Sequence, residues 1–313
     1  MNALALVFPG QGSQRIGMGR DFWAQVPEAR RFFEKGSESL GIDLARLCFE
    51  GPDELLTLTA NAQPAIMAVS MAAFAALQCE GVKFDYVAGH SLGEYSALVA
   101  AGSLAFEDAI RVVRKRGEFM QEAVVPGAGA MAAILGLDKE SVYTVCGEAA
   151  SHGVVEVANL NGPGQVVIAG ETKAVEHAIE LAKQRGAKRA VRLQVSAPFH
   201  CSLMGPAGKR LAAVLQAVPI ADPLVPLVNN VDAEFLMSRE EIAGSLVRQV
   251  TSPVRWEDVV RKLVKEGVTL FLELGPGKVL TGLIKRIAPE VTALYAEDLS
   301  SLQVAINQAK ALF

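Results

Sequence analysis

One serine of the chain lies in the sequence context that makes a hydroxyl group nucleophilic. Residues 89–93 read Gly-His-Ser-Leu-Gly, follow the strand-like pair Val87 and Ala88, and open a helical pattern. In so tight a strand-to-helix turn, small glycines flank one outward side chain, which predicts that Ser91 is a nucleophile. The amide of Leu92 would lie at the helix N-terminus, where free N–H groups favour an oxyanion. A serine that only caps the helix is the alternative.

A nucleophilic serine needs a base, and the chain has four histidines from which to choose by elimination. His152 lies in a polar turn, and His177 lies on the polar edge of an amphipathic helical pattern. His90 is adjacent to Ser91, and neighbouring side chains at such a turn point apart. His200 therefore remains as the predicted general base, and a histidine with only a packing role is the alternative.

One arginine interrupts the apolar side of the helix expected over residues 106–122. Arg116 lies between Val112 and Met120 on that side, whereas most other charged residues of the segment face the opposite way. A buried guanidinium without an anion is costly, so this position predicts a carboxylate partner. The partner is either an Asp or Glu of the protein or a substrate carboxylate, which an arginine can bind through two parallel hydrogen bonds.

A glycine-rich loop follows the first expected strand. Residues 10–14 read Gly-Gln-Gly-Ser-Gln, which has the spacing of neither a Walker A loop nor a dinucleotide-binding fingerprint. A tight loop of this kind could supply a second backbone N–H group beside that of Leu92. Taken alone, the loop is a weak signal.

Five basic residues cluster later in the chain with no acidic residue among them. Such a run is either a solvated face or a docking surface for an acidic partner. Its members are Lys183, Arg185, Lys188, Arg189 and Arg192.

These residues lie in a chain whose strand and helix patterns alternate. The alternation predicts an α/β fold. The expected strands cover residues 4–8, 84–89, 226–229 and 269–274, and the expected helices cover residues 21–35, 64–78, 91–101 and 106–122.

The middle of the chain has a different pattern of expected elements, in the order strand, helix, strand, strand, helix, strand. This order is typical of a ferredoxin-like α+β unit. We interpret residues 128–197 as an inserted subdomain, because strand and helix patterns resume after Pro198. Residues 1–127 and 198–313 then form one discontinuous main domain. The six inserted elements are expected at residues 131–137, 139–149, 154–159, 165–169, 172–184 and 189–195, with a turn over residues 161–164.

The composition excludes several classes of protein. Of the 313 residues, 51% are hydrophobic and 20% are charged, which excludes a disordered chain, and a net charge of -4 argues against a dedicated nucleic-acid binder. The longest apolar stretch, residues 65–77, is too short to span a membrane, and the N-terminus lacks the pattern of a signal peptide. Four widely spaced cysteines indicate reduced thiols and no zinc site. We expect a soluble cytoplasmic protein, and nothing in the sequence demands more than a monomer.

Together, these motifs resemble those of the malonyl-CoA:acyl-carrier-protein transacylases of type II fatty acid synthesis and of the related polyketide synthase acyltransferase domains. The resemblance covers nearly the whole chain. It rests on Phe8-Pro9-Gly10-Gln11-Gly12-Ser13-Gln14, Gly89-His90-Ser91-Leu92-Gly93-Glu94-Tyr95, Arg116, Pro198-Phe199-His200 and the segments 159–161, 228–230 and 273–277.

The resemblance implies a ping-pong transfer of a malonyl group from malonyl-CoA to the phosphopantetheine thiol of an acidic acyl carrier protein that binds transiently, with no bound cofactor. It implies an α/β-hydrolase-like main domain with a parallel sheet and an inserted ferredoxin-like subdomain. Arg116 would bind the malonyl carboxylate, the backbone N–H groups of Gln11 and Leu92 would form the oxyanion hole, and the backbone carbonyl of Gln249 would orient His200. The further pocket residues would be His90, Phe199, Asn159 and Asn161, and a bulky Phe199 would disfavour methylmalonyl groups.

Other functions remain compatible with the same residues. A serine hydrolase or thioesterase would use Ser91 and His200 but pass the acyl group to water. The same acyltransferase activity also serves polyketide and malonate decarboxylase systems. A docking subunit that has kept the fold without catalysis is a further alternative, against which the intact set of Ser91, His200 and Arg116 argues.

Overall fold

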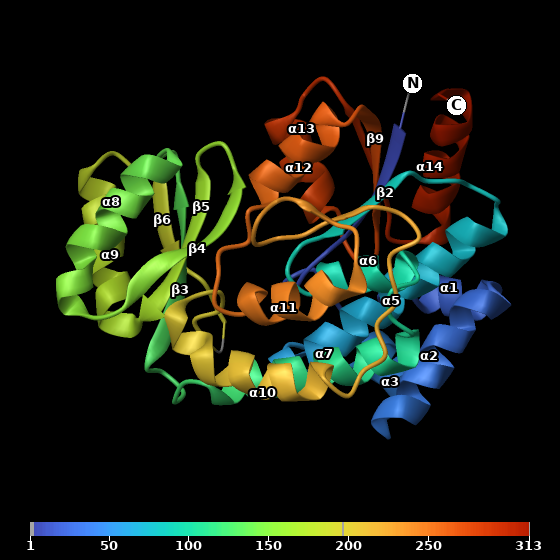
Figure 1. The fold of residues 1–313 in the computed structure, drawn as a ribbon, viewed down its shortest axis with the longest axis horizontal. Helices are drawn as coiled ribbons and strands as arrows, with labels where there is room; N and C mark the ends of the chain where they lie inside the picture. Colours follow the sequence, from blue (N-terminus) through green and yellow to red (C-terminus); the bar gives the residue numbers. More distant parts are fainter. Residues whose placement is uncertain (1–2, 196, 313) are drawn as a thin grey trace.

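The computed structural model describes residues 3–195 and 197–312 and shows two units of different size (Figure 1). In the described chain, the larger sheet has six strands in the order β10-β9-β1-β2-β7-β8. The pairs β1–β2, β1–β9, β9–β10 and β2–β7 are parallel, and β8 is antiparallel to β7. The strands are β1 (Ala3–Phe8), β2 (Tyr86–Gly89), β7 (Leu227–Val228), β8 (Phe235–Leu236), β9 (Val268–Leu274) and β10 (Thr292–Ala296).

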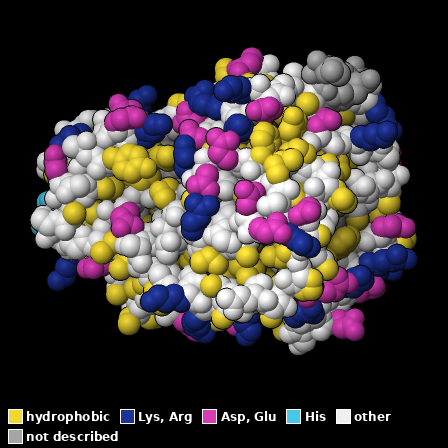
Figure 2. All heavy atoms as spheres, viewed as in Figure 1, with side chains coloured by type: hydrophobic (Ala, Val, Ile, Leu, Met, Phe, Trp, Pro, Cys, Tyr) yellow, Lys and Arg dark blue, Asp and Glu magenta, His cyan; other side chains and the backbone are white. Residues whose placement is uncertain are grey.

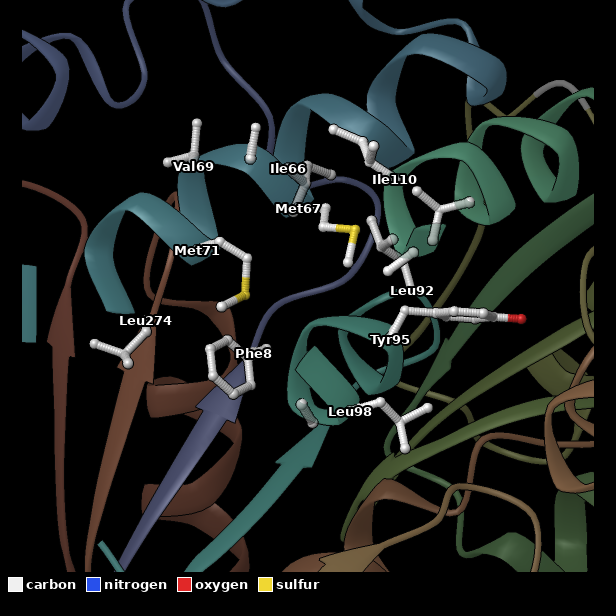
Figure 3. Packing of buried hydrophobic residues seen from close by; sticks show 14 of the residues in the cluster. Phe8, Ile66, Met67, Val69, Met71, Leu92, Tyr95, Leu98, Ile110 and Leu274 are labelled. Atoms are coloured by element: carbon white, nitrogen blue, oxygen red, sulfur yellow. The ribbon is translucent and has the colours of Figure 1, made fainter. Parts of the chain in front are cut away.

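Helices cover both faces of this sheet, as a buried parallel strand such as β1 requires. Leu4, Leu6 and Phe8 belong to one apolar cluster, whereas Ala5 and Val7 belong to another on the opposite face. This alternation follows from the two-residue period of a strand. In the first cluster, Phe8 of β1 and Leu274 of β9 point toward α5 (Figure 3). The helices of the larger unit are α1 (Arg20–Gln25), α2 (Pro27–Leu40), α3 (Leu44–Glu50), α4 (Asp53–Leu56), α5 (Thr59–Cys79), α6 (Gly93–Ala100), α7 (Phe106–Glu122), α10 (Gly205–Leu215), α11 (Arg239–Gln249), α12 (Trp256–Lys265), α13 (Val279–Ile287) and α14 (Leu299–Leu312), with a short 3-10 turn η2 (Ser202–Met204).

Two of the expected helices have different bounds in the structure. The single helix expected over residues 21–35 is wrong, because the chain is extended at Val26 and Pro27 starts a new helix, as a proline at a first helical position does. Helix α5 begins at Thr59, so Pro64 lies inside it. Proline has no backbone N–H group, so Pro64 cannot donate the helical hydrogen bond to the carbonyl oxygen of Ala60. Arg114 Nη1 donates to that oxygen instead, at 3.1 Å.

Helix α5 is also, among the residues that the structure describes, the one helix long and apolar enough to cross a membrane. Its apolar window is 78% buried inside the protein. This burial is what a core helix of a soluble fold would have, because the helix packs against α2 and α7.

The smaller sheet forms a separate antiparallel unit, whose described strands run in the order β4-β5-β3-β6. Its helices pack on the outer face, away from the larger unit (Figure 1), and the enclosed space holds an apolar cluster of its own. The fold class is therefore confirmed, with a parallel-rich sheet and a ferredoxin-like subdomain. The elements are β3 (Gly129–Leu135), α8 (Lys139–Ala149), a 3-10 turn η1 (Ala150–His152), β4 (Val155–Gly162), β5 (Gln165–Glu171), α9 (Thr172–Gln184) and β6 (Arg189–Arg192).

Strand β4 joins the two units. It is longer than expected and runs through Gly162, so the predicted start of the turn at Asn161 is wrong and both Asn159 and Asn161 lie on the strand. The N–H group of Leu160 donates to Val254 O, and that of Val254 donates to Ala158 O, both at 2.9 Å. These backbone bonds tie the subdomain to the segment that precedes α12.

Replacing Gly93 by alanine tests the close contact between β1 and α6. A Cβ atom at position 93 would lie 2.0 Å from Phe8 O. We therefore expect the free energy of unfolding, measured with urea, to fall by about 2–3 kcal/mol. Gly147→Ala is the matched control, because open space surrounds this position in α8 and alanine favours the helix. Equal stability of Gly93→Ala and the natural protein would contradict the contact.

Candidate active site

Ser91 lies at a strained turn between β2 and α6. Its φ angle is 52°, in the left-handed region that side chains other than glycine rarely adopt. A Cβ atom at Gly89 would lie 2.0 Å from the backbone of Gly93, so both flanking glycines are required by close backbone contact. The turn is further held by Asn230, whose Oδ1 accepts the N–H group of Ser91 at 2.6 Å. Strain of this kind is typical of a functional residue.

The structure brings Ser91 and His200 together. Ser91 Oγ lies 2.8 Å from His200 Nε2, and His200 Nδ1 lies 2.8 Å from the backbone carbonyl oxygen of Gln249. A carbonyl oxygen only accepts, so Nδ1 carries the proton and Nε2 accepts the serine hydroxyl. The group that orients the histidine is thus a peptide carbonyl, where many serine enzymes have a carboxylate.

The environment keeps His200 neutral. The side chain is buried, and burial, followed by the charge of Arg116, lowers the pKa of His200 to about 3. A neutral imidazole is the form that can remove a proton from serine. His200 has the electrostatic character of a general base at neutral pH.

Arg116 is 1% exposed and directed at the same serine. Its Nη2 donates to Ser91 Oγ at 3.1 Å and to Gln249 Oε1 at 2.9 Å, and its Nη1 donates to Gln63 Oε1 at 2.8 Å. The guanidinium lies 5.5 Å from the centre of the Tyr95 ring. Among the described residues no carboxylate forms an ion pair with Arg116, and its Nε has no hydrogen-bond partner. The guanidinium can therefore accept an external anion.

A cavity of about 360 Å³ opens above Ser91, His200 and Arg116. Backbone and side chains of both units line it, including Met131 of β3 and Leu193 after β6. The cavity therefore lies between the two units, and the inserted subdomain forms one of its walls.

Gln11 and Leu92 both line this cavity. The hydrogen bonds that hold the loop carrying Gln11 include those from Ser13 Oγ to Gly10 O at 2.8 Å and from Gln11 Nε2 to Thr59 Oγ1 at 3.1 Å. Leu92 precedes the first residue of α6. That their N–H groups bind an oxyanion remains a prediction, which this placement at the cavity wall favours.

The remaining predicted pocket residues lie around the same opening. Phe199 and Asn159 line the cavity, both 7% exposed. His90 also lines it but does not bond to Ser91, because His90 Nε2 lies 2.9 Å from Asn161 Oδ1. His90, Gln11 and Asn159 extend into a second cavity of about 270 Å³, to which Asn161 contributes.

Three buried polar side chains near Ser91 were missed by sequence reasoning. Gln63, Glu94 and Asn230 are at most 1% exposed and hydrogen-bond to the site. Gln63 could have been found by the argument used for Arg116, because it interrupts the apolar pattern of α5. Asn230 comes from a distant loop, and its approach to Ser91 has no sequence signal.

The basic run is partly neutralised in the structure. Lys183, Arg185 and Arg192 form ion pairs with Glu180, Glu148 and Glu176. For Lys188 and Arg189 no ion pair is found within the described part of the chain, and both are exposed. On the face in Figure 2, basic and acidic side chains are interspersed.

Metal-ligating residues do not gather anywhere in the described chain. No group of three or more His, Cys, Asp or Glu side chains there could hold a metal ion. The four cysteines, all within the described ranges, are free thiols.

Comparisons with known proteins agree on one family. The acyl transferase domain family matches residues 5–305. The chain is 50% identical over 311 residues to the malonyl CoA-acyl carrier protein transacylase of Bacillus subtilis, covering 99% of this chain and 98% of that protein. It is 48% identical over 308 residues to the protein of the same name from Escherichia coli K12, covering 98% and 100%.

Solved structures give the same result. An acyl-carrier-protein S-malonyltransferase from Burkholderia pseudomallei superposes with a TM-score of 0.96 at 47% identity, covering 98% of this chain and 100% of that one. A malonyl-transacylase solved in complex with a type II polyketide synthase acyl-carrier protein has a TM-score of 0.96 and 48% identity, with the same coverage.

The depressed pKa of His200 predicts the pH dependence of its chemistry. Because the neutral form persists down to a pH of about 3, the single-turnover rate of Ser91 acylation at saturating substrate should stay level between pH 8 and 5. Rapid quench of the acyl-enzyme measures this rate, with circular dichroism at each pH as the control for folding. A loss of rate with a midpoint near 6.5, the ordinary pKa of histidine, would show that His200 is not a buried neutral base.

Proposed function

The chain belongs to the acyl transferase domain family, and from this membership we propose that it transfers malonyl groups from malonyl-CoA to the phosphopantetheine thiol of an acyl carrier protein. One observation links this function to particular residues. Ser91 Oγ lies 2.8 Å from a base, His200 Nε2, and 3.1 Å from Arg116 Nη2. A nucleophile, a base and a cation without a direct ion pair in the described chain therefore converge on one point of one cavity.

The first half-reaction acylates Ser91. His200 Nε2 takes the hydroxyl proton as Ser91 Oγ attacks the thioester carbonyl carbon of malonyl-CoA. The C–S bond breaks, and the sulfur of coenzyme A leaves with the proton from His200. A malonyl-serine ester and free coenzyme A are the products.

The second half-reaction runs the same steps with a different thiol. The carrier's phosphopantetheine thiol gives its proton to His200 and attacks the ester carbonyl carbon. The C–O bond of the ester breaks, and Ser91 Oγ regains the proton. Malonyl-carrier is released, and the enzyme returns to its starting state without any bound cofactor.

Backbone groups support both steps. The N–H groups of Gln11 and Leu92 stabilise the negative oxygen of each tetrahedral intermediate, and one such donor is typically worth about 2.7–4 kcal/mol of barrier. The carbonyl oxygen of Gln249 keeps the proton of His200 on Nδ1, which leaves Nε2 free to act as base.

Arg116 determines the acyl group. A malonyl thioester carries a free carboxylate at the end opposite the sulfur, whereas an acetyl thioester has none. Arg116 lines the cavity, and its Nη2, which donates to Ser91 Oγ in this structure, can donate to that carboxylate instead. Phe199 lies at the cavity wall, where its bulk would disfavour a methyl branch at the α-carbon.

The partner is an acyl carrier protein, the kind of protein with which a structurally similar malonyl-transacylase was solved in complex. We propose that this chain acts as a cytoplasmic monomer in type II fatty acid synthesis. The support is that the similarity extends over nearly its full length to free-standing bacterial transacylases. The main domain of residues 1–127 and 198–313 would supply the catalytic residues, and residues 128–197 would supply the opposite wall.

Labelled malonyl-CoA tests the function directly. With carrier protein present, label should move to the carrier through a covalent enzyme intermediate that mass spectrometry detects. Ser91→Ala should remove the intermediate and about a thousandfold of the transfer rate, because Ser91 Oγ is the hydroxyl that contacts His200 Nε2. Rapid malonate release that carrier does not affect would instead identify a hydrolase. Absence of any covalent intermediate on the natural protein would favour the docking subunit.

Charge reversal on the subdomain tests where the carrier binds. Lys188 and Arg189 lie at the start of β6, which leads to the cavity-lining residues after Arg192. Lys188→Glu with Arg189→Glu should raise the KM for carrier about tenfold, while the acylation rate with malonyl-CoA stays unchanged.

The matched control for this experiment reverses Lys183 and Arg185 together, which changes the net charge equally. These two residues already pair with acidic side chains, so the KM for carrier should rise far less. Equal effects of the two double variants would reduce the role of Lys188 and Arg189 to general electrostatic attraction.

A further inference from the structure

A fully buried carboxyl group lies beneath the nucleophile without any ion-pair partner in the described chain. Glu94 stands three residues after Ser91 on α6 and is 0% exposed. Its Oε2 accepts hydrogen bonds from Gln249 Nε2 at 2.8 Å and from the backbone N–H group of Asn230 at 2.9 Å, whereas Oε1 has no partner. A carboxylate in such a place needs a nearby positive charge to be tolerated.

The side-chain amide of one residue, Gln249, connects Glu94 to a positive charge, that of Arg116. The side-chain amide of Gln249 accepts from Arg116 Nη2 on its oxygen and donates to Glu94 Oε2 from its nitrogen. A guanidinium can only donate and a carboxylate can only accept, so the two charges allow the amide a single orientation. The amide dipole is then aligned between a cation and an anion, which stabilises both.

We propose that Glu94 is the countercharge of Arg116, acting through the Gln249 amide, and that it thereby sets how tightly the site holds a substrate carboxylate. This inference rests on the proposed function, because it takes Arg116 as the group that binds the malonyl carboxylate. With Glu94 ionised, the empty site is close to neutral, so Arg116 binds the substrate without trapping it. The malonyl group can then leave with the carrier.

Glu94 also helps to position both the nucleophile Ser91 and the base His200. Asn230, which bonds to Glu94, accepts the N–H group of Ser91, and Gln249, which also bonds to Glu94, holds His200 through its peptide carbonyl. Glu94 touches no reacting atom. It is a positioning residue, and its effect on substrate passes through Gln249 and Arg116.

Burial of Glu94 also makes its charge sensitive to pH. The pKa of Glu94 is raised to about 7, chiefly by burial and to a smaller extent by the charge of Asp232. The hydrogen bonds from Gln249 and Asn230 and the charge of Arg116 act in the opposite direction. The other groups with an electrostatic effect on it are Tyr95 on the same helix and Arg248 on α11.

The direction of the pH effect on substrate affinity follows from which form of Glu94 is charged. Below a pH of about 7 Glu94 takes up a proton and loses its negative charge, so Arg116 attracts the substrate carboxylate more strongly. Malonyl-CoA should therefore bind more tightly at pH 6 than at pH 8, while acetyl-CoA should show no such change.

Equilibrium binding to the Ser91→Ala protein isolates this effect from turnover. In that background, Glu94→Gln should lower the Kd of malonyl-CoA at pH 8 about fivefold and leave the Kd of acetyl-CoA unchanged. The substitution keeps the shape and the accepting oxygen, so it removes little beyond the charge. It should also abolish the difference in malonyl-CoA affinity between pH 6 and pH 8.

Glu273→Gln is the matched control. Glu273 is equally buried, and its pKa is likewise raised by burial to about 7. However, its carboxylate caps α13 through Leu280 and Thr281 and has no bond to Arg116 or Gln249. Its neutralisation should leave both the affinity for malonyl-CoA and its pH dependence as they are.

The outcomes separate this inference from the proposed function. If the Ser91→Ala protein binds malonyl-CoA and acetyl-CoA equally, and Arg116→Ala weakens both alike, the carboxylate role of Arg116 fails. If malonyl-CoA is preferred but Glu94→Gln and pH leave its Kd unchanged, only the countercharge role fails. The pH series on Ser91→Ala alone decides the question should Glu94→Gln not fold.

Discussion

The burial of one guanidinium organises the polar interior of this protein. Arg116 lies in the apolar stripe of α7, where an uncompensated charge is expensive. Its η nitrogens are therefore satisfied by Gln63, Gln249 and Ser91, and a carboxylate stands behind Gln249. The network leaves the buried Nε without a hydrogen-bond partner, and Arg116 lines the cavity above Ser91. The same buried cation contacts the nucleophile and, in the proposed function, selects the substrate.

Gln249 connects this cation to catalysis. Its peptide oxygen fixes the tautomer of His200, while its side-chain amide links Arg116 to Glu94. One residue at the end of α11 therefore contacts the histidine through its backbone and links the cation to the buried carboxyl group through its side chain. Because a carbonyl oxygen, unlike a carboxylate, adds no charge beside His200, the imidazole stays neutral in its buried position.

Two units enclose the reaction. The larger sheet supplies the nucleophile at the carboxyl end of β2 and the loop after β1, where parallel sheets commonly place their sites. The smaller sheet supplies the facing wall from β3, β4 and the segment after β6. Backbone bonds of β4 to Val254 tie that wall to the larger unit.

By itself, the sequence determined the local features: the strand–glycine–serine–helix turn at Ser91, the misplaced cation Arg116, the choice of His200 and the order of the inserted elements. These depend on short-range sterics and hydrophobic period, which neighbouring residues reveal. Only the tertiary structure decided that Asn230 and Glu94 meet behind Ser91, that Pro64 is tolerated because Arg114 bonds to Ala60, and that Arg116 has no direct ion pair. Those outcomes join residues far apart in the chain, and no local pattern encodes how such segments pack.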